Sequence, residues 1–171
     1  MLKIVNIVAT VTLPHSLDLQ KLQFTLPETE SSSKVHWLKM RLQPEGTYIA
    51  FYKSGKFLVT GKSFEEITNN TNRVIALLKK VNITVDPWQL KVHNIVLSDQ
   101  IEMETSIENL MYSLDPKKAS YEPEQFPALV YKDWGVSILL FNSGKTIISG
   151  VKEEARAQEI MNKFRNLVTV Q

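Results

Sequence analysis

Apolar and polar residues follow the same succession of patterns twice along the chain. Each succession begins with a run rich in β-branched residues, at 2–13 and again at 90–98, which is typical of a β-strand. A short helical pattern comes next, several strands follow, and a longer amphipathic helix ends the succession. This repetition predicts two equivalent halves, residues 1–87 and 88–171, with Pro87 at the boundary.

Short sequence matches support the repeat. Asn6-Ile7-Val8 recurs as Asn94-Ile95-Val96, and Ser54-Gly55-Lys56 recurs as Ser143-Gly144-Lys145. The two motifs stand 48 positions apart in the first half and 49 in the second. In each half the Ser-Gly pair predicts the tight turn of a β-hairpin.

The periodicities predict an α+β fold. Strands are expected at 35–42, 47–52, 56–60, 128–132, 136–141 and 145–149, in addition to the two that open the halves. Short helices are expected around 19–22 and 107–114, and long helices over 64–81 and 157–168. No flexible linker separates the halves, so we expect them to share one continuous antiparallel sheet.

Two of the predicted helices begin with a capping-box pattern. The motifs are Ser63-x-x-Glu66 in the first half and Thr105-x-x-Glu108 in the second. In such a box the hydroxyl oxygen accepts a hydrogen bond from the backbone N–H three residues on. The helices are therefore expected to start at these positions.

Both faces of the predicted sheet contain apolar residues. Four helices cover only one face, which leaves Val8, Val96, Leu139, Phe141 and Ile147 on the other, among Asn and hydroxyl residues. Such a face needs a partner. It suits the floor of a DNA minor groove, where A·T pairs present only acceptors, and it suits equally a sandwich or a homodimer.

Composition limits the remaining classes. The chain has 171 residues, 43% of them hydrophobic, and no cysteine, so it can form a core without disulfides. No apolar stretch reaches the length of a membrane span. The formal net charge is +2, but residues 1–87 hold 11 Lys+Arg against 7 Asp+Glu and residues 88–171 hold 9 against 11. A basic and an acidic half permit two different partners.

No catalytic or metal-binding constellation is visible. His15, His36 and His93 lie far apart in the sequence without carboxylates at metal spacing. No phosphate-binding or nucleophile-elbow motif occurs, and Ser54-Gly55-Lys56 is a turn. We therefore expect a protein that is not an enzyme and has no cofactor and no metal. The three tryptophans are expected to pack at sheet edges or in loops.

Three segments carry a specific resemblance. They are Asn6-Ile7-Val8-Ala9-Thr10-Val11-Thr12-Leu13, Tyr121-Glu122-Pro123-Glu124-Gln125-Phe126-Pro127-Ala128-Leu129-Val130-Tyr131-Lys132 and Leu139-Leu140-Phe141-Asn142-Ser143-Gly144-Lys145. Together they resemble the TATA-binding protein family over essentially the whole chain, closely in the second half and with divergence in the first. The sequence of residues 122–126 is more similar to archaeal than to eukaryotic members of this family.

The resemblance implies a pseudo-two-fold saddle with about ten strands, four helices on its convex face, and a concave face that binds and bends A·T-rich promoter DNA in the minor groove. The implied hydrogen-bonding residues are Asn6, Thr10, Thr60, Asn94 and Ser149. The implied apolar floor is Val8, Leu58, Val96, Leu139 and Ile147. The implied phosphate contacts are Arg41, Lys56, Lys132, Lys145 and Lys152, with Lys62 less certain.

The aromatic wedges that such a saddle inserts between bases are unequal in this chain. Phe126 and Phe141 form the second-half pair. In the first half Val35 occupies one phenylalanine position and Tyr52 the other, unless the adjacent Phe51 takes that role through a register shift. Otherwise either the DNA is kinked less at that end or an A·T-rich step that unstacks easily suffices there, so the resemblance implies the mode of binding but does not fix site choice or affinity.

The resemblance also implies protein partners. Glu122, Glu124 and Gln125 would dock a transcription-factor-B-type protein, and with it the RNA polymerase machinery. We expect the protein where the DNA is, in the cytoplasm or nucleoid of an archaeal-type cell, or in a nucleus. Without DNA the apolar face favours a homodimer. The alternatives are a specialised or regulatory paralogue with weakened or altered DNA binding, and an interaction module that does not bind DNA.

Overall fold

A computed structural model of the protein describes residues 1–31 and 36–169. The described residues form ten strands and four helices. The strands are hydrogen-bonded in the order β2-β3-β4-β5-β1-β6-β10-β9-β8-β7, and the pairs whose register is resolved are antiparallel. The predicted α+β class, with about ten strands and four helices, is confirmed.

Each half of the chain contributes five strands and two helices in the same order. The first set is β1 (Lys3–Thr12), α1 (Leu19–Thr25), β2 (Thr29–Ser31), β3 (Trp37–Leu42), β4 (Thr47–Tyr52), β5 (Lys56–Gly61) and α2 (Phe64–Lys80). The second set is β6 (Gln89–Gln100), α3 (Ile107–Ser113), β7 (Ala119–Ser120), β8 (Ala128–Asp133), β9 (Val136–Phe141), β10 (Lys145–Val151) and α4 (Glu154–Thr169). Strands β4 and β9 agree residue for residue with the expectation.

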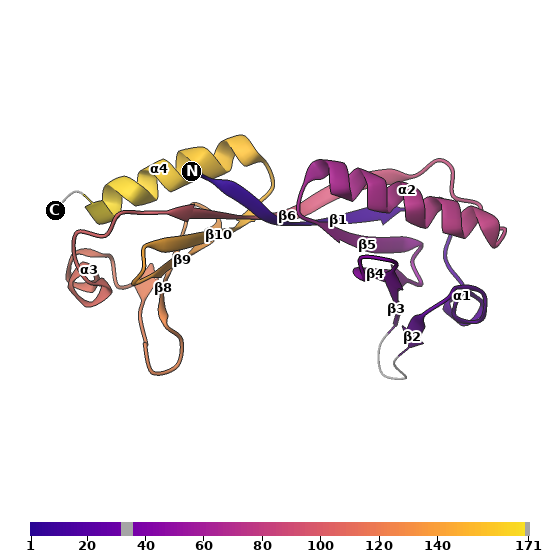
Figure 1. Ribbon diagram of the computed structural model, residues 1–171, viewed down its shortest axis with the longest axis horizontal. Coiled ribbons are helices and arrows are strands. Elements are labelled where there is room, and N and C mark those ends of the chain that lie inside the picture. Colours follow the sequence, from indigo (N-terminus) through magenta and orange to yellow (C-terminus); the bar gives the residue numbers. More distant parts are fainter. Residues whose placement is uncertain (32–35, 170–171) are drawn as a thin grey trace. The chain divides into compact units, whose positions relative to one another are not determined.

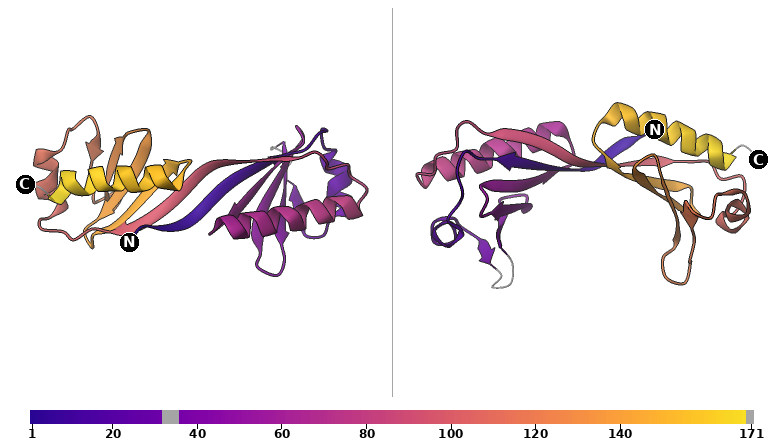
Figure 2. Two further views of the ribbon diagram at one scale, coloured as in Figure 1. Left: turned by 90° about the horizontal axis from the view of Figure 1, so that it is seen from above. Right: turned by 180° about the vertical axis from the view of Figure 1, so that it is seen from behind.

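The chain divides into two compact units. One comprises residues 6–93, which we call the first unit, and the other comprises residues 1–5 with 94–171, which we call the second unit. In the first unit α2 lies along β5, and in the second α4 lies along β10 (Figure 1). Figure 2 shows these two helices from above and from behind. In each unit the long helix therefore covers one face of the strands.

The core of the first unit lies between its strands and α2. Strand β1 buries every second residue, with Ile7, Ala9 and Val11 inaccessible to solvent. Phe51 and Phe57 are directly paired across β4 and β5, with ring centroids 5.7 Å apart. This alternation, with half-buried residues between the buried ones, shows that only one face of the strands meets the helix.

The start of α2 confirms the first capping box. The Ser63 side chain accepts a hydrogen bond from the Glu66 backbone N–H at 3.1 Å. The Glu66 carboxylate in turn accepts one from the Lys62 backbone N–H at 2.7 Å. The first bond satisfies an N–H of the first helical turn, and the second satisfies the N–H of the residue that precedes the cap.

The second capping box was placed one residue too early. Ser106, not Thr105, caps α3 and accepts from the Asn109 backbone N–H at 3.4 Å. Thr105 instead accepts from the Asn109 side chain at 3.1 Å. Two adjacent hydroxyl residues before one helical pattern do not reveal in the sequence which of them adopts the extended cap conformation.

The hairpin turns follow the Ser-Gly signals. Gly55 and Gly144 have positive φ values of 87° and 80°. Each donates a backbone hydrogen bond back across its turn, Gly55 to Tyr52 at 3.1 Å and Gly144 to Phe141 at 2.8 Å. These glycines fix the register between the paired strands and so determine which side chains share a face.

Within the described part of the chain, no helix is long and apolar enough to cross a membrane.

Candidate nucleic-acid interface

The face of the strands opposite the long helix, here called the open face, contains the residues left half-buried by the alternation. In the first unit Val8 is paired with Thr60 and Thr10 with Leu58. Each pair shares a face because directly opposed residues of antiparallel strands point to the same side. The four side chains are half-buried, and they form a mixed apolar and hydroxyl surface.

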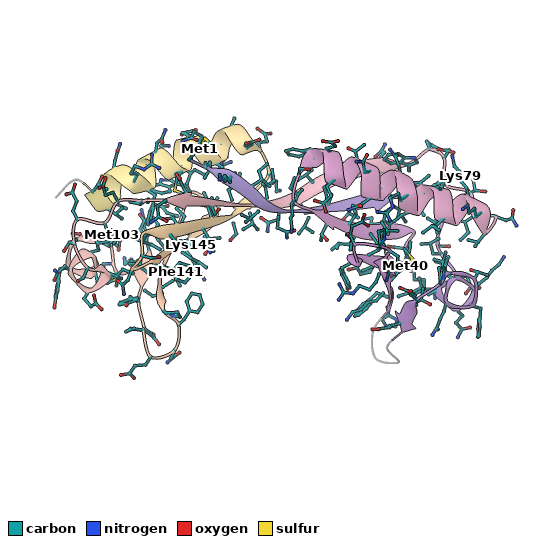
Figure 3. All side chains as sticks on the ribbon, in the orientation of Figure 1. Met1, Met40, Lys79, Met103, Phe141 and Lys145 are labelled. Carbon is teal, nitrogen blue, oxygen red and sulfur yellow. The ribbon has the colours of Figure 1, made fainter. Side chains whose placement is uncertain are left out.

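The open face of the second unit has the same construction. Ile147 lies between Leu139 on β9 and Ser98 on β6, and Ser149 is paired with Ser137. Asn94 and Val96 lie on the same face of β6 as Ser98, because every second residue of a strand points to the same side. The predicted apolar floor residues of this half therefore do lie together on the side away from α4. Figure 3 labels Phe141 and Lys145 on this side of the strands.

An aromatic pair borders this surface. Phe141 ends β9, and its ring centroid lies 6.2 Å from that of Phe126 in an edge-to-face arrangement. Phe126 belongs to a turn in which its backbone N–H donates to the Glu122 carbonyl at 2.9 Å. Its side chain is 43% exposed. An exposed phenylalanine beside an apolar floor has a free edge with which to contact a ligand.

The amide of Asn94 has a fixed orientation. Strands β6 and β10 lose their regular register between Ile148 and Val151, where Gly150 has a φ of 93°. The Gly150 backbone N–H donates to Oδ1 of Asn94 at 2.6 Å. Because Oδ1 is the only acceptor atom of the amide side chain, the Nδ2 group points away from Gly150 and its donors remain available to a ligand.

Tyr52, and not Phe51, lies on the open face of the first unit. Tyr52 is half-buried and paired with Lys56. Phe51 is inaccessible to solvent and packs against Phe57 on the helix side. The alternative in which Phe51 takes the wedge position is therefore wrong, because the hairpin at Gly55 sets the register. Val35, the other wedge position, lies outside the described residues.

Beside Arg41, which is a predicted phosphate contact, the open face of the first unit contains Trp37, Lys39 and Tyr48, which the sequence did not single out as binding residues. Trp37, Lys39 and Arg41 alternate along β3, where Trp37 is paired with Tyr52 and Arg41 with Tyr48. The ammonium of Lys39 lies 4.7 Å from the Trp37 ring centroid and 5.8 Å from that of Tyr48. The sequence could have revealed these residues. Trp37 and Lys39 stand four and two positions before Arg41, so on a strand they point to the same side as that predicted phosphate contact.

The electrostatics of this group favour a neutral tyrosine beside cations. Burial raises the pKa of the Tyr48 hydroxyl and the nearby Tyr52 raises it further, while Arg41 lowers it, with a net increase. The Arg41 guanidinium lies 5.5 Å from the Tyr48 ring centroid. The Tyr48 hydroxyl therefore stays protonated at neutral pH and leaves the positive charges of Lys39 and Arg41 uncompensated by a phenolate.

The predicted phosphate-binding residues are all accessible. Arg41, Lys56, Lys132, Lys145 and Lys152 are exposed, as is Lys62. Lys132 lies opposite Ser137 on the open face and Lys145 follows the turn at Gly144. Exposed cations at strand ends and turns beside an apolar floor match a duplex, whose phosphates flank its groove.

The predicted protein-docking residues form one exposed turn. Glu122, Glu124 and Gln125 are exposed, and the Gln125 backbone N–H donates to the Glu122 carbonyl at 2.9 Å. The turn lies between β7 and β8. It presents two carboxylates together, which suits a basic partner surface.

Among residues 1–31 and 36–169, no group of three or more His, Asp or Glu side chains is arranged to hold a metal ion.

Comparisons with known proteins agree with this geometry. The family model described as transcription factor TFIID (or TATA-binding protein, TBP) matches residues 1–81 and again 89–169. The TATA-box-binding protein of Sulfurisphaera tokodaii is 36% identical over 165 residues, covering 93% of this chain and 82% of that protein. The TATA-box-binding protein of Archaeoglobus fulgidus is 32% identical over 175 residues, covering 97% and 96%.

A solved structure is similar as well. The Methanococcus jannaschii TBP superposes with a TM-score of 0.87 at 31% identity, covering 98% of this chain and 97% of that one. The two successive matches of the family model coincide with the two sets of strands and helices.

Proposed function

We propose that this chain, which belongs to the TATA-binding protein family, binds A·T-rich TATA promoter elements in the minor groove, bends the duplex and recruits a transcription-factor-B-type partner with the RNA polymerase machinery. Membership of this family supports a role as a general transcription factor. The observation that carries the DNA-binding proposal is the open face, which pairs an apolar floor with polar donors.

The chemistry of the floor favours A·T base pairs. Val96, Leu139 and Ile147 offer no partner to the amino group that guanine places in the minor groove. The Nδ2 donors of Asn94 match the N3 and O2 acceptors of adenine and thymine. We assign the same role to Asn6 in the first unit, with Thr10, Thr60 and Ser149 as flanking hydroxyl groups and Val8 and Leu58 as apolar floor.

Bending is assigned to the aromatic residues. Phe126 and Phe141 have the size and exposure to enter between two base steps at one end of the site. Apolar side chains inserted in this way unstack the step and kink the duplex, a behaviour for which this family is the reference case. Tyr52 takes the corresponding place in the first unit.

Phosphate contacts supply the sequence-independent part of the affinity. Arg41, Lys56, Lys132, Lys145 and Lys152, with Lys62, are placed to neutralise phosphates along the groove. Such contacts release counterions, so binding should weaken as salt rises. The protein would accordingly act wherever the DNA lies, and without DNA its open face would favour a homodimer.

Partner docking is assigned to the turn after β7. Glu122, Glu124 and Gln125 are exposed, in the same turn as Phe126 but not on the strands that form the floor. A basic surface on the B-type factor would match them. Occupying this turn leaves the floor free for DNA, so both partners can bind together.

A specialised or regulatory paralogue is the second candidate. Tyr52 replaces a phenylalanine-type wedge, and Trp37, Lys39 and Tyr48 give the first unit an open face unlike that of the second. Such a protein would keep the docking turn but bind DNA weakly or with a changed preference.

The test is a gel-shift titration on a TATA duplex and a G·C-substituted duplex at two salt concentrations, with and without the B-type factor. Preference for the TATA duplex that weakens with salt supports the first candidate. TATA binding that appears only with the B-type factor supports the paralogue. No preference under any condition contradicts the first candidate and favours an interaction module that does not bind DNA. Phe126→Ala is compared with the wild type in the same titration. The Phe126 ring is exposed, so the fold should tolerate its loss.

A further inference from the structure

The two units present different side chains at equivalent positions of their open faces. Strands β3 and β8 have the same length and the same register to their neighbours, with Trp37 opposite Tyr52 and Ala128 opposite Phe141. Two residues further along, Lys39 is opposite Ala50 in the first unit. At the equivalent place in the second unit, Val130 is opposite Leu139. Position by position, a tryptophan replaces an alanine and a lysine replaces a valine.

The third difference lies on the adjacent strand. Tyr48 is opposite Arg41, whereas the equivalent Ser137 is opposite Lys132. Trp37, Lys39 and Tyr48, here called the β3–β4 cluster, are all half-buried. At the equivalent described positions of the second unit, Ala128, Val130 and Ser137 supply neither a ring nor a cation.

The cation of the cluster lies against aromatic rings, and the strand register also pairs Lys39 with the exposed Glu30 on β2, with which it forms no salt bridge. The Lys39 ammonium lies over both the Trp37 and Tyr48 rings, at 4.7 and 5.8 Å from their centroids. Within the described part of the chain, Lys39 and Arg41 form no salt bridge with a carboxylate. Aromatic faces attract a cation without removing its charge, so Lys39 remains available to an anionic or electronegative ligand.

We propose that the β3–β4 cluster determines specificity, by making the first unit read its half of the DNA site through the Lys39 cation and the Trp37 ring while the second unit reads its half through an apolar floor. This inference rests on the proposed function. A lysine on the floor finds base acceptors and a strongly negative potential in an A·T minor groove. The potential is greatest along uninterrupted A-tracts, whereas TA steps unstack most easily.

The consequence is a preferred orientation on an asymmetric site. The second unit, with Phe126 and Phe141, should take the half that contains TA steps. The first unit should take the half with an uninterrupted A-run. Both halves consist of A·T pairs, so the preference does not depend on exclusion of guanine.

The orientation of the protein on DNA can be measured directly. The chain contains no cysteine, so a single introduced cysteine can be labelled at one known position. A single cysteine introduced as Pro123→Cys, in the exposed turn of the second unit, carries an iron chelate that cleaves nearby DNA. The labelled protein is bound to a duplex with one TA-step half and one A-run half, and to the same duplex with the halves exchanged. Cleavage near the TA-step half, which moves when the halves are exchanged, is the expected result.

The variants replace cluster residues by their counterparts in the second unit. Trp37→Ala, Lys39→Val and Tyr48→Ser are combined in one protein, and Lys39→Val is tested alone in case the triple variant folds poorly. The control is Lys80→Ala, which removes one positive charge from α2. We expect the cluster variants to lose about tenfold in orientation preference and to show a salt slope shallower by about 0.9, while the control keeps its orientation.

The possible outcomes distinguish failure of the inference from failure of the proposed function. Wild-type protein that prefers the TATA duplex but lies equally in both orientations overturns the inference and leaves the proposed function intact. So does a folded Lys39→Val variant with unchanged orientation and salt slope. Wild-type protein that shows no preference for the TATA duplex overturns both.

Discussion

The Arg165 guanidinium lies 2.6 Å from Oδ2 of Asp99 and joins α4 to β6 within the second unit. The Asp99 side chain is 1% exposed, and its other oxygen accepts from the Met1 ammonium at 2.8 Å. The two cations offset the cost of burying the Asp99 carboxylate. Removal of the carboxylate charge leaves the Met1 ammonium and the Arg165 guanidinium without a counter-charge.

Asp99→Asn should therefore destabilise the protein. We expect the free energy of unfolding to fall by about 2 to 4 kcal/mol, because an amide offers one acceptor in place of two charged oxygens. Urea unfolding followed by circular dichroism measures the change. Glu159→Gln is the control, since Glu159 forms an exposed pair with Lys163 within α4. An equal loss in both variants would contradict the role assigned to the buried carboxylate.

The same carboxylate should make stability depend on pH. Burial raises the pKa of Asp99, but hydrogen bonds from the Met1 ammonium and the Gln100 N–H, with the charges of Met1 and Arg165, lower it below its ordinary value. The stabilisation is then present above the unfolded-state pKa and disappears as pH falls through the folded-state pKa. Unfolding curves from neutral to acidic pH should converge for the wild type and Asp99→Asn. Curves that stay parallel would exclude this coupling.

The turn glycines provide a test of the register. Gly55 has a φ of 87°, and a Cβ there would clash with the His15 carbonyl oxygen. Gly46 has a φ of 71° but nothing within 4 Å of the same position. Gly46→Ala should cost about 1 kcal/mol, the penalty of the left-handed conformation alone. Gly55→Ala should lower the free energy of unfolding by about 1 to 3 kcal/mol more than Gly46→Ala does, because of the close contact. Equal melting temperatures for the two variants would contradict this packing.

Much of the architecture could be predicted from the sequence because its repeat is supported at several levels. The alternation of 136–141 and the turn at Gly144 determine β9 without knowledge of any tertiary contact. The edge strands β2 and β7 could not be predicted, since three and two residues are too short to show a period. Their strand conformation depends on pairing with β3 and β8.

The candidate site was predicted less evenly. Residues on a strand with a clear parity, such as Val96 and Ile147, lie together as expected. The choice between Phe51 and Tyr52 needed the cross-strand register, which only the folded hairpin supplies. Trp37 was expected to pack at a sheet edge. Its contact with Lys39 depends on a side-chain conformation that no sequence period reports.

Tyr52→Phe tests whether the first unit is limited by its wedge. The hydroxyl of Tyr52 must lose water if the ring enters between bases, whereas the equivalent Phe141 carries no such group. The variant should bind the TATA duplex several-fold more tightly and bend it more, as measured by energy transfer between dyes at the duplex ends. Phe141→Ala should reduce both quantities, with about 1 to 3 kcal/mol of lost stacking. A Tyr52→Phe variant that bends DNA no more than the wild type would place Tyr52 outside the kinked step.

Asn94→Asp tests the hydrogen-bond chemistry of the floor without disturbing the fold. The Gly150 N–H already occupies Oδ1 of Asn94, and an aspartate oxygen would accept it equally well. The substitution changes only the outward group, from an amide donor to an anionic acceptor. That acceptor would face the N3 and O2 acceptors of A·T pairs and the negative potential of the groove. We expect at least a tenfold loss of TATA affinity in the gel shift with an unchanged melting temperature. Ser98→Ala, on the same strand and face, is the control for a change that adds no charge. If Asn94→Asp binds as tightly as the wild type, the open face does not lie in the minor groove.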